Sequence, residues 1–132
     1  MEANLSASNL AGAAEGQRLN AQLTRLYQEG KYEEAVPIAR QLVALAKKVL
    51  GPDHPDVATS LNNLAEIYSA QGQYAMALPL YEQALSIVKK ALGHDHPNFA
   101  LSLNNLAGLY HARGQDVKAV PLYRQALSIW IA

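Results

Sequence analysis

The chain has 132 residues, and 11 lysine and arginine side chains balance 11 aspartate and glutamate side chains, so its formal net charge at pH 7 is zero. Half of the residues are hydrophobic and only 17% are charged, which is the balance of one packed domain rather than of a disordered chain. A neutral chain has no general attraction for nucleic acid or an anionic membrane, and without cysteine it forms neither a disulfide nor a thiolate metal site.

The first sixteen residues are small and polar, and they predict a flank (1–16) that is partly ordered or helical. They have neither the basic start nor the apolar core of an export signal. No apolar stretch in the chain approaches the roughly 18–20 residues that a membrane span needs. We therefore expect a cytoplasmic protein with a single domain over residues 17–132.

A repeat of 42 residues organises that domain. Residues 61–90 return as residues 103–132 with 18 of 30 positions identical, and the same offset relates the linkers LGPDHP and LGHDHP. A weaker copy begins near Leu19. Because repeats of this length stack on one another, the sequence predicts three units, over residues 17–57, 58–99 and 100–132.

Each unit is expected to form two antiparallel helices. In the middle unit Leu61, Leu64 and Tyr68 recur at helical spacing, Gly72 interrupts the pattern, and a second apolar stripe ends before Gly93. Strand patterns are absent from the sequence. The predicted fold class is therefore all-α, a right-handed solenoid of three antiparallel helix hairpins.

The two linkers predict how the units are joined. His54 and His96 are expected to cap the next helix, because a proline follows each of them at the first helical position. Three more prolines recur near the start of the second helix of each unit. Pro37, Pro79 and Pro121 are expected within about the first turn, where a missing N–H costs little.

Small residues at the helix contacts, a tyrosine in each helix and a glycine in the turn resemble a tetratricopeptide repeat. The matching residues in the middle unit are Leu61, Leu64, Ala65, Tyr68, Gly72, Tyr74, Ala77, Tyr81 and Ala84. In the last unit they are Leu103, Leu106, Ala107, Tyr110, Gly114, Ala119, Tyr123 and Ala126. The common repeat has about 34 residues, so this longer unit is similar to the kinesin-light-chain-like subclass. The resemblance implies a scaffold that binds other proteins.

Two departures from the repeat pattern bear on its ends. Leu23 and Leu26 stand in the first unit where the middle unit has Ala65 and Tyr68, and this predicts an edge repeat. Asp116 stands in place of the turn aromatic, and we expect it to loosen the last hairpin.

The first helices of stacked units are expected to line a concave groove that binds a peptide segment of a partner protein. The side chains predicted to contact it are Asn20, Thr24, Tyr27, Thr59, Asn62, Asn63, Glu66, Leu101, Asn104, Asn105 and His111. An asparagine side chain both donates and accepts hydrogen bonds, so Asn20, Asn62 and Asn104 could hold an extended backbone. The alternative for Asn63 and Asn105 is that they hydrogen-bond to neighbouring backbone and keep adjacent units in register.

The predicted groove contains no lysine or arginine, which makes it a poor fit for an acidic partner. Chaperone-binding relatives hold a C-terminal carboxylate with a clamp of cations. Asn20, Leu101 and Asn105 occupy the corresponding cationic positions here, so the resemblance does not extend to that clamp.

The end of the sequence suggests two other functions. It stops before a further linker, which predicts a piece of a longer array that is uncapped at the C-terminus. Exposed Leu127, Trp130 and Ile131 are then expected to drive self-association or swapping of the last hairpin. The alternatives to peptide binding are thus a self-assembling structural module and an excised or engineered repeat fragment without its own ligand.

Catalysis, cofactors and metals are not expected. The sequence has no nucleophile elbow, P-loop or dinucleotide fingerprint. His94, Asp95 and His96 cluster in one linker, with Asp53 and His54 in the preceding one. Linkers one repeat apart are expected to lie too far apart for one metal shell, so the sequence predicts turn and cap roles for these residues.

Overall fold

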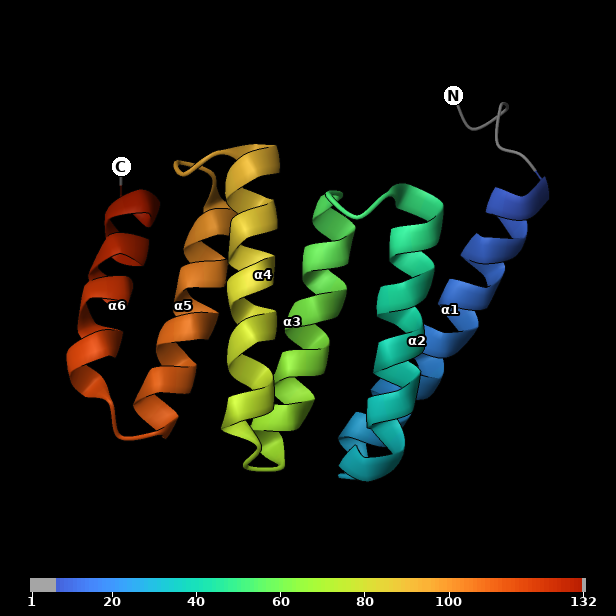
Figure 1. Ribbon diagram of the computed structural model, residues 1–132, viewed down its shortest axis with the longest axis horizontal. Helices are drawn as coiled ribbons and strands as arrows, with labels where there is room; N and C mark the ends of the chain where they lie inside the picture. The colour runs from blue at the N-terminus through green and yellow to red at the C-terminus, as the bar shows by residue number, and fades with distance from the viewer. Residues whose placement is uncertain (1–6, 132) are drawn as a thin grey trace.

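The computed structural model describes the backbone of residues 7–131 and the side chains of residues 13–131, and over this range it contains helices and no strand. Six helices stand side by side in chain order (Figure 1). They are α1 (Ala7–Gln28), α2 (Tyr32–Leu50), α3 (Pro55–Ala70), α4 (Tyr74–Leu92), α5 (Pro97–Ala112) and α6 (Asp116–Trp130). The predicted all-α solenoid of three hairpins is confirmed.

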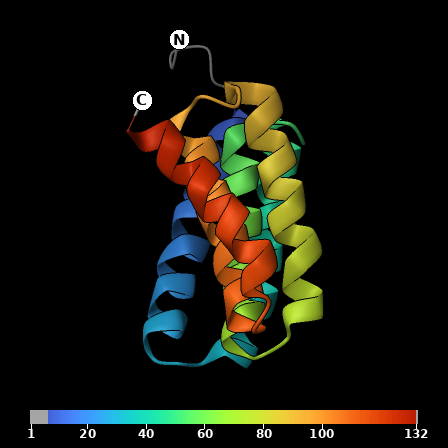
Figure 2. The same cartoon turned by 90° about the vertical axis from the view of Figure 1, so that its left-hand side faces the viewer.

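The helices pack mainly against their neighbours in the chain. Contacts join α1 to α2, α2 to α3, α3 to α4, α4 to α5 and α5 to α6, and a smaller contact joins α3 to α5. Figure 2 looks along the row from the α6 end, with the successive hairpins stacked behind it. Because each hairpin rests on the next one, the apolar core is continuous through the array.

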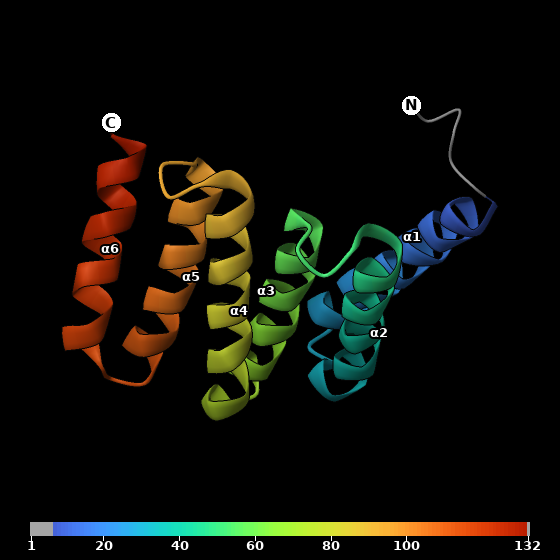
Figure 3. The same cartoon turned by 45° about the horizontal axis from the view of Figure 1, so that its top comes forward.

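The N-terminal flank continues directly into the first hairpin from Ala7 onward, because α1 begins at that residue. Residues 1–6 of the predicted flank lie outside the described residues. Figure 3 shows the first turns of α1 extending beyond α2. The other units divide at the linkers, so the boundaries expected at residues 57–58 and 99–100 fall within the first turns of α3 and α5.

Each hairpin turn closes with the same backbone hydrogen bonds. In the middle hairpin the N–H of Gln73 donates to the carbonyl of Tyr68 at 2.8 Å, and the N–H of Gly72 donates to that of Ser69 at 2.9 Å. This is the Schellman arrangement, and it requires the left-handed backbone (φ 75°) that Gly72 adopts. The glycine of the turn therefore determines where α3 ends.

Histidine caps the helix that follows each linker, as predicted. The Nδ1 atom of His54 accepts the backbone N–H of Asp56 at 3.0 Å, and Nδ1 of His96 accepts that of Asn98 at the same distance. A proline takes the first helical position after each cap. The linker histidines thus have a structural role.

The prediction for the three recurring prolines was wrong. Pro37, Pro79 and Pro121 are each the sixth residue of their helix, in the second turn rather than the first. An N–H at that position would donate to the carbonyl four residues earlier, so each proline removes one interior hydrogen bond. All three prolines are exposed.

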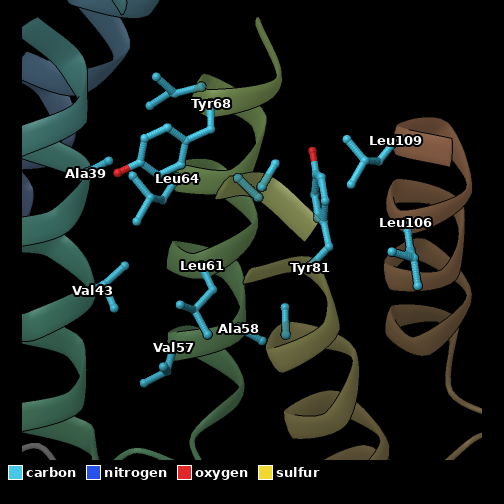
Figure 4. Packing of buried hydrophobic residues seen from close by; sticks show 14 of the residues in the cluster. Ala39, Val43, Val57, Ala58, Leu61, Leu64, Tyr68, Tyr81, Leu106 and Leu109 are labelled. Carbon is cyan, nitrogen blue, oxygen red and sulfur yellow. The ribbon is translucent and has the colours of Figure 1, made fainter. Parts of the chain in front are cut away.

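The core contains small and large side chains, because alanines of every helix from α2 to α6 are buried together with leucines and tyrosines. Ala77 and Ala84 of α4 have no exposed surface. Figure 4 shows Tyr81 of α4 lying toward Leu106 and Leu109 of α5. No helix in the described range has the length and apolarity to cross a bilayer.

Candidate functional site

Two hollows adjoin on the face that α1, α3 and α5 form. The first has a volume of about 380 Å³ and lies between α1 and α3. Asn20, Thr24 and Tyr27 from α1 line it, together with Asn63 and Glu66 from α3. Helical spacing explains the set, because residues three and four apart share one face of a helix.

The second hollow has a volume of about 500 Å³ and continues from the first between α3 and α5. Asn104 and Asn105 line it from α5. Glu66 and Tyr27 line both hollows, so the two form one groove that crosses three successive hairpins. We call this pair of hollows the A-face groove.

The residues shared by the two hollows are joined by a hydrogen bond. The hydroxyl of Tyr27 donates to Oε1 of Glu66 at 2.7 Å, which links α1 to α3. The ring of Tyr27 also packs against that of Tyr32, with the ring centroids 5.4 Å apart. Two tyrosine rings and one carboxylate, from α1, α2 and α3, are thereby held together, and of these residues Tyr27 and Glu66 line the groove.

The charge of Glu66 affects the tyrosines around it. The hydrogen bond to Glu66, together with burial, raises the pKa of Tyr27 to about 12. Burial first, and then the charge of Glu66, raises the pKa of Tyr81 to about 12. Both hydroxyls therefore remain protonated and neutral at physiological pH, where Glu66 supplies a negative charge to the groove.

Four of the predicted asparagines and Thr59 line hollows where a ligand could reach them. Asn63 lines the first hollow, and with Asn20 and Thr59 it also lines a third hollow of about 470 Å³ beside α2. Asn104 and Asn105 line the second hollow.

Asn62 is placed differently from the asparagines that line the groove. It lines none of these three hollows, and its Oδ1 atom is buried without a hydrogen-bond partner among the described residues. The series along the groove is thus Asn20, Asn63 and the Asn104–Asn105 pair, whereas the sequence suggested Asn20, Asn62 and Asn104.

Besides Asn62, two more predicted contacts lie outside these hollows. Leu101 is 52% exposed on α5. Nδ1 of His111 lies 2.6 Å from Oδ1 of Asp116, which joins the end of α5 to the start of α6. The substitution of Asp116 for the turn aromatic thus supplies a polar contact within the last hairpin that the repeat pattern did not predict.

The residues predicted to self-associate lie in the last turn of α6 and directly after it. Leu127, Trp130 and Ile131 are all exposed, Trp130 by 51%. Trp130 corresponds by the 42-residue offset to Val88 of the middle unit, which is only 4% exposed. Trp130 thus stands at a position that is buried in α4, which packs against both α3 and α5.

The hollows also contain residues that sequence reasoning placed in the core alone. Tyr74, Tyr81 and Tyr123 line the second hollow from α4 and α6. The repeat pattern assigned them to helix packing, and Tyr74 and Tyr81 do pack against the core. The recurrence of Tyr81 as Tyr123 at the 42-residue offset was a signal that could have identified these two.

No group of three histidine, aspartate or glutamate side chains within the described residues is arranged to hold a metal ion. His94 and Asp95 approach one another to 3.6 Å on the exposed linker. The A-face groove offers amides, tyrosine hydroxyls and one carboxylate, which suit hydrogen bonding to a ligand.

The sequence matches the model of a known protein family. The tetratricopeptide repeat family matches residues 25–90 and again residues 60–132.

Solved structures with the same fold include kinesin light chain repeats. The nearly identical TPR-like repeats of a Podosopora anserina protein described as a kinesin light chain superpose with a TM-score of 0.76 at 36% identity, covering 86% of this chain and 54% of that chain. The chain thus spans about half the length of that relative. BtubC (BKLC) from P. vanneervenii matches at a TM-score of 0.73 and 21% identity over 94% of this chain and 55% of that chain. The TPR domain of Arabidopsis FLU matches at 0.75 and 17% identity over 89% and 95%. These last two likenesses show the fold alone.

Proposed function

The chain belongs to the tetratricopeptide repeat family, with repeats of the kinesin light chain kind, and from this premise we propose that it binds an extended peptide segment of a partner protein in the A-face groove. Tetratricopeptide repeats generally mediate contacts between proteins and generally have no enzymatic activity. The observation that carries the proposal is the continuity of the two hollows across three hairpins.

The lining of the groove supports a peptide as the occupant. A peptide backbone presents alternating donors and acceptors, and the amides of Asn20, Asn63 and Asn105 can satisfy both kinds. The two hollows are lined by α1, α3 and α5 in turn, so the amides of the groove come from three successive hairpins. Hydrogen bonds to the backbone give affinity, and the hollows between the helices receive side chains.

A substitution in the groove tests this function directly. Peptides selected from a random dodecapeptide library on the purified chain should bind the Asn63→Ala/Asn105→Ala variant roughly tenfold more weakly, because each lost amide removes hydrogen bonds to the ligand. Affinity is measured by fluorescence anisotropy, and far-UV circular dichroism verifies that the variant is folded.

A matched variant on the other helices controls for general effects of losing two amides. Gln41 of α2 and Gln125 of α6 are exposed and line none of the hollows that form the groove. The Gln41→Ala/Gln125→Ala variant should bind the peptides with unchanged affinity. Equal binding by the wild type and the Asn63→Ala/Asn105→Ala variant would show that recognition occurs elsewhere.

The exposed apolar end of α6 supports a second function, association between copies of the chain. Trp130 corresponds to Val88 of α4, which is buried where α4 packs against its neighbours α3 and α5, so a first helix of a further unit is the kind of surface that would cover it. A second copy carries such helices. Contacts of this head-to-tail kind join the end of one molecule to another part of the next one.

Replacing Trp130 tests the association. Multi-angle light scattering over a concentration series should give a mass above that of the monomer for the wild type, and Trp130→Glu should restore the monomer, because a buried charge opposes the contact. Met76→Glu is the matched control, since Met76 is 47% exposed on α4, away from α6. A wild-type mass that stays monomeric at every concentration excludes association.

A further inference from the structure

Glu66 lies where the two hollows of the A-face groove meet. Its side chain lines both of them, and the residue is exposed. The hydroxyl of Tyr27 donates to one of its two carboxylate oxygens. This hydrogen bond fixes the position of the carboxylate and leaves the other oxygen available to a ligand.

The negative charge of Glu66 is not balanced by a cation of the chain. Among the described residues, no lysine, arginine or histidine forms an ion pair with Glu66 within 4.0 Å. The two hollows of the groove have no lysine or arginine in their linings. Glu66 is also the only aspartate or glutamate in these linings, so the groove has one isolated charge at its centre.

Tyrosines surround this charge. Tyr27, Tyr74, Tyr81 and Tyr123 line the second hollow together with Glu66. Aromatic rings attract cations to their faces, and the attraction adds to that of a carboxylate beside them. A planar guanidinium or an ammonium group on an apolar stem matches such a hollow, because the stem packs on the rings while the charged end meets the carboxylate.

We propose that the hollow at Glu66 receives a lysine or arginine side chain of the bound peptide. The inference rests on the peptide-binding function proposed above and adds a chemical class to it: the partner segment is cationic at the position that meets α3. Charge complementarity supports this class, because the carboxylate of Glu66 forms no ion pair among the described residues and neither hollow is lined by a competing lysine or arginine. An acidic segment would place its charge against Glu66 and would be repelled.

The test uses peptides selected from a random dodecapeptide library on the purified chain. Selected peptides should share a lysine or arginine at one position. Replacing that residue by a neutral isostere, citrulline for arginine or norleucine for lysine, should weaken binding about tenfold, as expected for the loss of a charge-assisted hydrogen bond. Affinity is measured by fluorescence anisotropy at low and at high salt.

The variant Glu66→Gln separates the charge from the shape of the site. Glutamine keeps the side-chain length and an oxygen that accepts from Tyr27, so the helices keep their contact. We expect Glu66→Gln to bind the cationic peptide about tenfold more weakly and the neutral isostere with unchanged affinity. Glu82→Gln is the matched control, since Glu82 is exposed on α4 outside the groove, and it should retain the preference for the cation.

The outcomes distinguish the two proposals. This inference is overturned, and groove binding is not, if the selected peptides bind the groove without a shared cation. The same holds if the Glu66→Gln variant still prefers the cationic peptide. The function on which the inference depends is overturned if no peptide is selected, or if the Asn63→Ala/Asn105→Ala substitutions leave the affinity unchanged.

Discussion

Truncating Leu103 to alanine is expected to lower the free energy of unfolding by about 2–5 kcal/mol, because the change leaves a cavity in a tightly packed interior. Leu103 is among the largest fully buried side chains of the protein. It lies on α5, which packs against α4 on one side and α6 on the other. The cavity therefore weakens the connection of the last hairpin to the rest of the array.

Urea unfolding followed by circular dichroism at 222 nm measures the effect. Leu101→Ala is the matched control, because Leu101 lies two residues earlier on the same helix and is 52% exposed. We expect that variant to unfold within about 0.5 kcal/mol of the wild type, as is usual for surface positions. Equal losses for the two variants would contradict the packing described for α5.

Enlarging Ala84 to leucine is expected to be nearly as damaging, with a cost of about 1–3 kcal/mol, because the added carbons have no space to occupy. Ala84 lies on α4 with 0% of its surface exposed, and α4 packs against both α3 and α5. A larger side chain there pushes α4 away from the helices packed around it.

The matched control for Ala84→Leu is Ala91→Leu. Ala91 lies on the same helix with its side chain exposed, and leucine there meets solvent. Thermal unfolding monitored by circular dichroism should give a clear fall in Tm for Ala84→Leu and almost none for Ala91→Leu. An unchanged Tm for Ala84→Leu would mean that there is space beside Ala84 for a larger side chain, although Ala84 itself is fully buried.

The fold could be predicted from the sequence because the repeat supplies the same signals more than once. Gly72 and its counterpart Gly114 define the hairpin turns, and the histidine-proline pairs define where α3 and α5 begin. The prolines inside the second helices were misplaced because a helix start without a capping side chain leaves no sequence signal. Lys31, Gln73 and Gln115 precede those helices and form no side-chain cap.

The site was less predictable, because it depends on which way adjacent side chains point. Asn62 and Asn63 are neighbours in the sequence and differ by about 100° around the helix, so a small rotation of α3 decides which of them meets the groove. The structure places Asn63 in the first hollow. The hydrogen bond between Tyr27 and Glu66 joins residues 39 positions apart, and no local pattern indicates it.

The packing of each helix against its neighbours in the chain has a consequence for how such a protein changes in evolution. Consider a second copy of residues 55–96 inserted after His96. Its two helices would pack between α4 and α5 through contacts like those that join these helices now, because the block is 42 residues long and so keeps the offset of the repeat. The inserted block would also add another glutamate in the position of Glu66 to the groove. The length of the groove therefore depends on how many times one gene segment is duplicated. A longer partner segment can be bound by adding hairpins, without a new fold.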